Sequence, residues 1–387
     1  MNAFYLSIFM KITELRFFNI RNHQQTEIEF DKQLNIICGL NGSGKTSVLE
    51  AISICSYSKS FQQASDVSLI RYGESFYQTD IQAINDLKIN YFAKVRSEIN
   101  QKKEISSSFG SRLSARDLIG EMPLIVLSPD LKLITSGTPQ DRRDFIDKIL
   151  CQSSRSYFDK LMNFKKILKQ RNNLLTQIKL EINSARIQLP SWTELFIKSG
   201  AELIVAREKF IRDFREKFIL YYSTVSHGKE SVELNYYPHG NEFIDNSDDL
   251  SLIIEKLKVL SDNLSRDEIR RGVSLFGPQK DELIIQIGKG IARESASQGQ
   301  HKSLLIALKF AEFEFLKEIR NETPIVLLDD IFSELDPERI EQVISLLSEN
   351  SAQTFITVTD VSFIKKIINQ HLHSVYSVNN GMVTQNS

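Results

Sequence analysis

Gly39-Leu40-Asn41-Gly42-Ser43-Gly44-Lys45-Thr46 lies between an apolar run at 34–38 and a helical pattern at 45–56. In this order of strand, glycine-rich loop and helix, consecutive backbone N–H groups and the helix N-terminus can surround phosphate oxygens. Lys45 is placed to neutralise the β- and γ-phosphates of a nucleotide, and Thr46 offers a hydroxyl to Mg²⁺. The eight residues therefore predict a site for ATP and Mg²⁺.

A second apolar run, 325–328, ends in two carboxylates, Asp329 and Asp330. At the end of a strand, Asp329 would hold Mg²⁺ directly or through water. Asp330 would lie beside the γ-phosphate and position or deprotonate the attacking water, which makes it a catalytic candidate together with Lys45. Two adjacent acids at a strand end can instead cap the next helix. The phosphate-binding loop earlier in the chain favours the metal and water roles.

Ser297-Gln298-Gly299-Gln300 opens a long helical pattern. Ser297 is a good N-cap, and capping alone would explain it. In the functional interpretation, Ser297 and the free N–H groups near Gly299 form a second anion site. A chain with one phosphate-binding loop and one separate anion site holds half of each of two composite sites. Two copies packed head to tail would then clamp each ATP between them, which predicts an ATPase that forms a homodimer with ATP.

Strand patterns occur toward both ends of the chain, and a helical segment separates them. The predicted strands are 12–18, 26–30, 34–38, 81–95, 124–127, 231–237, 283–287, 325–328 and 354–358. This arrangement predicts an α/β fold in which one ATPase domain is interrupted by a helical insertion. The predicted divisions are an N-terminal part of the ATPase head at 1–140, a helical arm at 141–265 and a C-terminal part of the head at 266–387.

Within the insertion, apolar residues from Leu161 to Ile182 follow an alternating three-four spacing that only Arg171 interrupts. Leu189-Pro190-Ser191 breaks the run, and a second helix with the same spacing is expected to start there. Two such helices joined by a short turn predict an antiparallel hairpin with arms of about 40 Å each. Two core helices of a bundle are the alternative.

The net charge of −1 conceals an uneven distribution. Residues 151–220 carry fourteen Lys and Arg against seven Asp and Glu, and residues 301–350 carry five against eleven. Such asymmetry indicates either a solvated helix face or a nucleic-acid surface. On the second interpretation, Lys165, Lys166 and Lys169 are candidates for contacts with the duplex backbone.

Cys38, Cys55 and Cys151 form no CxxC pair and no cluster with histidine, which favours a reducing compartment over a disulfide framework or a zinc site. No apolar run approaches the roughly 20 residues that a membrane span requires, and the first ten residues lack the features of a signal peptide. The sequence therefore predicts a cytoplasmic protein without a membrane partner. The first strand pattern begins near Met10, which is an alternative start.

Together with SELD at 333–336, the three segments resemble ABC-type ATPases of the SMC and RecF group, and the match to the RecF family spans nearly the whole chain from Met10. It is carried by NIRNH at 19–23, NGSGKTSVLEAI at 41–52, LIRYG at 69–73, SPD at 128–130, RRDFID at 142–147, GPQKDEL at 277–283 and LLDDIFSELD at 327–336. The paired aspartates replace the Asp-Glu that is usual in SMC and transporter ATPases.

The resemblance implies an ABC-type P-loop ATPase head that acts in DNA repair, DNA replication and the SOS response. It implies slow, DNA-stimulated ATP hydrolysis, binding to duplex and gapped DNA, and partners of the RecR and RecO type during the loading of recombinase. Two positions depart from family patterns: Gln279-Lys280 stands where RecF proteins usually have His-Arg, and Thr359-Asp360 stands where transporter ATPases have a histidine.

Three rival functions are a transport ATPase subunit, an SMC-type chromosome organiser and a P-loop kinase. The long insertion and the missing histidine oppose the first, and an arm of tens rather than hundreds of residues opposes the second. A kinase would not need Ser297-Gln298-Gly299.

Overall fold

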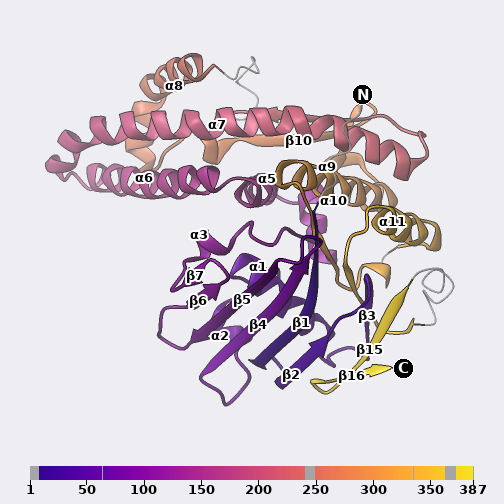
Figure 1. Cartoon of the computed structure of the whole chain (residues 1–387). Helices are drawn as coiled ribbons and strands as arrows, with labels where there is room; N and C mark the ends of the chain where they lie inside the picture. The colour runs from indigo at the N-terminus through magenta and orange to yellow at the C-terminus, as the bar shows by residue number, and fades with distance from the viewer. Residues whose placement is uncertain (1–7, 63, 240–248, 334, 362–371, 387) are drawn as a thin grey trace. The chain divides into compact units, whose positions relative to one another are not determined.

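The computed structural model describes residues 8–62, 64–239, 249–333, 335–361 and 372–386 (Figure 1). The chain forms two compact units, one of Met1–Leu131 with Lys309–Ser387 and one of Lys132–Leu308. The domain boundaries expected at 140/141 and 265/266 stay predictions, and the central compact unit extends from Lys132 to Leu308.

The phosphate-binding loop follows a buried strand of a six-stranded sheet in the first unit. The strands lie in the order β16 (Met382–Asn386), β15 (His373–Asn379), β3 (Leu34–Cys38), β14 (Thr354–Val358), β13 (Ile325–Leu328) and β8 (Leu124–Leu127). All neighbours are parallel except β15 and β16. Strands β8, β13 and β14 are buried throughout, as is typical of parallel strands covered on both faces. Parallel pairing brings the carboxyl ends of β3, β13 and β14 to one edge.

A second, largely antiparallel sheet covers the helix that follows the loop. It contains β12 (Glu322–Thr323), β1 (Ile8–Ile20), β4 (Phe76–Asn85), β5 (Asn90–Glu98), β6 (Glu104–Ser107) and β7 (Gly110–Ser111), with β2 (His23–Glu29) paired to β1. Burial alternates along β4 and β5, so one face of these strands points to the core. Helix α1 (Lys45–Tyr57) is buried over nearly its whole length and contacts β1, β4 and β5. The predicted β region at 81–95 is thus two strands joined by a turn.

Short helices and α11 complete the first unit. They are α2 (Asp66–Leu69), α3 (Ala115–Leu118) and α11 (Pro337–Glu349), which Asp336 caps by accepting from the backbone N–H of Arg339.

Helices dominate the second unit. They are α4 (Leu133–Ser136), α5 (Pro139–Ser153), α6 (Arg155–Lys179), α7 (Asn183–Ser226), α8 (Leu250–Arg271) and α9 (Ala292–Ser295), beside a three-stranded sheet of β9 (Val232–Tyr237), β10 (Glu282–Ile287) and β11 (Gly290–Ile291). Helix α10 (Gln298–Arg320) begins in this unit and ends in the other. Helices α6 and α7 run side by side as the predicted antiparallel hairpin (Figure 1).

The predicted start of the second arm at Pro190 is wrong, because α7 begins at Asn183 and continues through Pro190. The chain reverses instead at 180–182, where Glu181 has φ 64°. Pro190 lacks the N–H that would bond to the carbonyl of Arg186, but both residues are exposed, so water can satisfy that carbonyl. With 25 residues α6 is about 37 Å long, near the predicted arm length, whereas the 44 residues of α7 make it about 66 Å long.

Arg171 interrupts the apolar pattern of α6 because it forms a buried ion pair. Its guanidinium donates to both carboxylate oxygens of Glu268 on α8, at 3.0 and 2.6 Å, and to the hydroxyl of Ser274 at 2.7 Å. The side chains of Arg171 and Glu268 are 2% and 1% exposed. The guanidinium also lies over the rings of Phe196 and Phe276. Arg171 of α6 thus contacts α7, α8 and the segment that follows α8.

No helix within the described ranges has both the length and the apolar character needed to cross a membrane.

We predict that Arg171→Met destabilises the helical unit by about 3–5 kcal/mol, because Glu268 would remain as a buried charge without its partner. Unfolding in urea can be followed by the fluorescence of Trp192, the only tryptophan, which packs against Leu174, Ile178 and Ala185. The double variant Arg171→Met/Glu268→Gln should recover part of the loss, since it removes the unpaired charge. A loss below about 1 kcal/mol in the single variant would show that the pair does not stabilise this unit.

Candidate nucleotide-binding site

The phosphate-binding loop has the backbone shape that its glycines predict. Gly42 and Gly44 have φ of 77° and 111°, a region that residues with a Cβ rarely adopt. A Cβ on Gly44 would lie 2.3 Å from Nε2 of His23, and one on Gly39 would lie 2.4 Å from the carbonyl oxygen of Val378. The loop therefore needs glycine for conformation at Gly42, for close packing at Gly39 and for both at Gly44.

Lys45 begins α1 and points back over the loop. Its Nζ donates to the carbonyl oxygens of Gly39 at 2.8 Å and Leu40 at 3.0 Å, and the residue is 7% exposed. The ammonium is thus held beside the backbone that would surround a phosphate, where a positive charge lowers the cost of bringing in an anion.

Thr46 and Asp329 meet at the edge where β3 and β13 end. The hydroxyl of Thr46 donates to Oδ1 of Asp329 at 3.0 Å, and the hydroxyl of Thr357 at the end of β14 donates to the same oxygen at 2.9 Å. The pKa of the Asp329 carboxyl is raised, mainly because the group is buried. The hydroxyls of Thr357 and Thr46 act in the opposite direction, and the negative charges of Asp330 and Glu50 add to the increase. A buried carboxylate with acidic neighbours and a hydroxyl beside it is a set of hard oxygen donors that suits Mg²⁺.

Asp330 follows with φ 50°, and its backbone N–H donates to the hydroxyl of Thr357 at 2.8 Å. This turn separates the two aspartates: Asp329 faces Thr46, whereas Asp330 lines the open cavity over the loop. A carboxylate in this position can accept a proton from a water molecule in the cavity.

The cavity has a volume of about 460 Å³, within the range of small-molecule sites. It brings together most of the predicted site, because residues of the loop line it with Lys45, Thr46 and Asp330. Six further polar residues line the cavity that were not predicted from the sequence, and they are Arg21, Asn22, Ser47, Glu50, Gln62 and Thr357.

Arg21 and Glu50 form an ion pair in the cavity wall. The guanidinium of Arg21 donates to both carboxylate oxygens of Glu50 at 3.2 and 3.1 Å, and Ser60 donates to one of them at 2.7 Å. Glu50 is 1% exposed and is the one acidic residue of α1. A single acid in this helix and an arginine in the β1–β2 turn were the only sequence features that could have predicted the Arg21–Glu50 pair.

Ser297 and Gly299 belong to the other compact unit, at the start of α10. The hydroxyl of Ser297 accepts from the backbone N–H of Gln300 at 3.2 Å, and the side chain of Gln300 accepts from the N–H of Ser297 at 2.7 Å. Ser297 is thus an N-cap in a reciprocal capping box, and it is exposed. The capping interpretation is confirmed, and a second role as an anion site stays a prediction.

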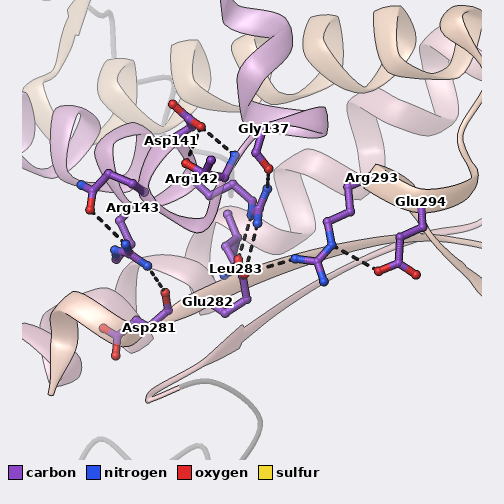
Figure 2. Close-up of polar contacts among 11 residues, drawn as sticks. Gly137, Asp141, Arg142, Arg143, Asp281, Glu282, Leu283, Arg293 and Glu294 are labelled. Atoms are coloured by element: carbon purple, nitrogen blue, oxygen red, sulfur yellow. Dashed lines mark hydrogen bonds and ion pairs between the residues drawn. The ribbon is translucent and has the colours of Figure 1, made fainter. Parts of the chain in front are cut away.

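Two of the charged segments that carry the resemblance to the RecF family, RRDFID and GPQKDEL, pack on one another (Figure 2). Arg142 donates to both carboxylate oxygens of Glu282 at 2.8 and 3.0 Å, and Arg143 donates to the carbonyl of Asp281 at 2.7 Å. The buried Arg207 of α7 binds Asp147 at 2.8 Å and Asp281 at 2.7 Å. These segments therefore stabilise the helical unit.

Four residues depart from the family patterns, and they are Gln279, Lys280, Thr359 and Asp360. Gln279 donates to the carbonyl of Phe276 at 2.5 Å, and Lys280 is exposed. Thr359 and Asp360 follow β14 and are exposed.

Comparison with known proteins agrees with this geometry. Residues 11–384 match the family described as RecF/RecN/SMC N terminal domain. The DNA replication and repair protein RecF of Phocaeicola vulgatus is 35% identical over 97% of this chain and 98% of its own length. The chain belongs to the RecF family. The RecF of Chloroherpeton thalassium is 33% identical over 91% of this chain and 95% of its own length.

A solved structure of the recombination mediator protein RecF with ATP, in the RecFOR pathway, has a TM-score of 0.88 and 26% identity. It covers 100% of this chain, and this chain covers 99% of it. The predicted fold class, an ABC-type P-loop ATPase head with an inserted helical arm, is thereby confirmed for this RecF-family chain. Its family is one of DNA replication and repair.

We predict that Lys45→Ala weakens ATP binding by about 10- to 150-fold, the effect of losing a hydrogen bond to a charged group. Titration with a fluorescent ATP analogue measures this. Lys103→Ala is the matched control, because Lys103 also donates to a backbone carbonyl, that of Ser58, but does not line the cavity. Wild-type affinity in Lys45→Ala would contradict the assignment of the loop.

Proposed function

We propose that this RecF-family chain binds ATP and Mg²⁺ at the loop, dimerises head to tail, grips duplex DNA near single-strand gaps and helps to load recombinase. Slow, DNA-stimulated hydrolysis of ATP then permits release. The observation that carries the proposal is that the loop, Lys45, Thr46 and Asp330 line one cavity and that Thr46 contacts Asp329 at its edge.

In this proposal the residues from Gly39 to Thr46 bind the phosphates, and Lys45 neutralises their charge. Thr46 and Asp329 hold Mg²⁺, which when bound supplies Lewis acidity at the β- and γ-phosphate oxygens. Their hydroxyl and carboxylate are 3.0 Å apart, so both can be ligands of one ion with little movement. Asp330 orients the attacking water and accepts its proton.

Ser297 and Gly299 supply the other half of the site to a second copy. The first N–H groups of α10 and the positive end of its dipole favour an anion there. Each ATP would then lie between the loop of one protomer and the start of α10 of its partner.

DNA would be bound through phosphate contacts from the head and from the arm. Lys165, Lys166 and Lys169 are all exposed on α6. Because the contacts are with the backbone, binding would depend on salt more than on sequence. Partners of the RecR and RecO type belong to the same proposal, since the solved relative acts in the RecFOR pathway. A cytoplasmic location fits the three free cysteines.

Ser297→Arg tests the composite site. The variant keeps its own loop, so ATP binding by the monomer should survive. The bulk of the arginine side chain should keep the partner's phosphate away from the start of α10, which should abolish ATP-dependent dimers and reduce hydrolysis to background. Size-exclusion chromatography with ATP and a phosphate-release assay measure the two effects. Ser297→Ala is the control, because it loses the same cap, worth about 1 kcal/mol, without adding bulk or charge.

Mixing Ser297→Arg with Lys45→Ala chains sharpens this test. A mixed dimer contains one site made of two wild-type halves and one made of two altered halves. Partial hydrolysis in the mixture, absent from either variant alone, is expected. Normal dimers and normal hydrolysis by Ser297→Arg alone would exclude the head-to-tail arrangement.

The triple variant Lys165→Gln/Lys166→Gln/Lys169→Gln should bind duplex DNA more weakly. The slope of log affinity against log salt should fall by up to about 2.7, at about 0.9 for each lost phosphate contact. Fluorescence anisotropy across a salt series measures both quantities.

The control is a second triple variant, Lys88→Gln/Lys102→Gln/Lys289→Gln, which removes the same charge from exposed lysines outside α6. If both triple variants lose affinity equally, only net charge matters. If the α6 variant keeps its affinity and slope, its lysines form a solvated face.

A further inference from the structure

Two hairpin turns hold the outer side of the phosphate-binding loop. The β1–β2 hairpin contributes Asn22 from its turn and His23 from the first position of β2, and the turn between β15 and β16 contributes Gly381. We refer to Asn22, His23 and Gly381 as the outer brace. All three come from the first compact unit.

The outer brace donates to three successive carbonyl oxygens of the loop. Nδ2 of Asn22 lies 3.3 Å from the carbonyl oxygen of Gly42 and 2.8 Å from that of Ser43. The N–H of Gly381 lies 3.0 Å from the Ser43 oxygen. Nε2 of His23 lies 3.0 Å from the Gly44 oxygen.

Fixing these carbonyls also fixes the amides that follow them. Because a peptide group is planar and trans, its C=O and its N–H point in opposite directions. A carbonyl held on the outer side therefore turns the next N–H toward the cavity. For the Gly44 carbonyl that group is the N–H of Lys45. Inward N–H groups attract phosphate, whereas inward carbonyl oxygens would repel it.

The brace fits against the loop without spare room. A Cβ on Gly381 would lie 2.4 Å from the carbonyl oxygen of Asn22, and Gly44 packs as closely on His23. Asn380 and Gly381 have φ of 46° and 78°, which is the Asn-Gly pattern of a two-residue hairpin turn. The position of the loop thus depends on a turn more than 330 residues away in the sequence.

His23 has no exposed surface, and its ring lies 4.9 Å from that of Phe17. Since a carbonyl oxygen can only accept, Nε2 carries the proton toward Gly44. Nδ1 lies 2.8 Å from the hydroxyl of Thr26. Burial is the largest influence on the ring and lowers the pKa of His23. The contacts of both nitrogens orient the imidazole toward the loop.

We propose that His23 is a positioning residue for nucleotide binding: its Nε2–H holds the Gly44 carbonyl outside the cavity, so that the amide of Lys45 faces the bound phosphate. Asn22, at the edge of the cavity, and Gly381 fix the Gly42 and Ser43 carbonyls beside it. The inference rests on ATP binding at this loop, which belongs to the proposed function.

Three substitutions of His23 separate hydrogen bonding from packing. The amide nitrogen of glutamine can reach the place of Nε2, that of asparagine is too short, and leucine fills space without a donor. His23→Gln should keep ATP affinity within about twofold of the wild type. His23→Asn and His23→Leu should lose about 2- to 13-fold, the effect of one hydrogen bond. Titration with a fluorescent ATP analogue measures the affinities, and thermal melting shows that each variant is folded.

Thr79→Val is the matched control for buried polarity. Thr79 has no exposed surface and donates to the carbonyl of Ala51, outside the cavity, so its loss should lower the melting temperature without a change in ATP affinity. If His23→Leu does not fold, His23→Gln and His23→Asn still test whether the hydrogen bond to Gly44 matters, because the two side chains are equally polar and differ in reach.

Hydrogen exchange without nucleotide distinguishes failure of this inference from failure of the proposed function. Amides of residues 42–47 should exchange faster in His23→Asn than in the wild type or in His23→Gln. If the wild type binds no ATP, the proposed function fails while this difference remains. Equal exchange and equal ATP affinity in His23→Asn and the wild type would overturn the inference, as would a glutamine variant as impaired as leucine.

Discussion

A backbone amide that faces a phosphate has a carbonyl group facing the other way, and that carbonyl needs a donor. The structure meets this need at Gly42, Ser43 and Gly44 with donors of the outer brace, which come from outside the loop. Within the loop, Lys45 donates to the carbonyls of Gly39 and Leu40. The two sheets of the first unit are arranged so that these donors reach one place. An anion site made of backbone thus depends on the packing of strands that do not touch the anion.

Buried arginines have a comparable role in the helical unit. Arg171, Arg207 and Arg142 each bind carboxylates from segments far away in the sequence. Burying such charges without partners would cost several kcal/mol, so each pair favours one arrangement of helices and strands over others. Apolar residues between α6 and α7 stabilise the unit by removing their surface from water, whereas the ion pairs determine which segments lie next to one another.

The sequence was most informative where function is encoded locally. The strand, glycine loop and helix at 34–57 and the acids after β13 need only a few neighbouring residues to be interpreted, and the structure brings Thr46 and Asp329 to one point. Thr357, the Arg21–Glu50 pair and His23 could not be found in this way, because their contacts arise from the pairing of distant strands. Pro190 misled because the usual effect of proline on helices is weakened where the affected carbonyl is exposed. Arg171 looked like a defect in a seam because its partner lies 97 residues later.

The place of β3 in its sheet has a consequence for synthesis of the protein. Both of its neighbours, β14 and β15, are made more than 300 residues after it. On the ribosome, this apolar strand therefore waits with both edges unpaired through most of translation, a state that invites wrong pairing. The loop that follows β3 is in the same position, since Gly381 emerges later still. The nascent chain should thus acquire its nucleotide site only in the last stage of elongation, which makes chaperone binding to the early segment advantageous.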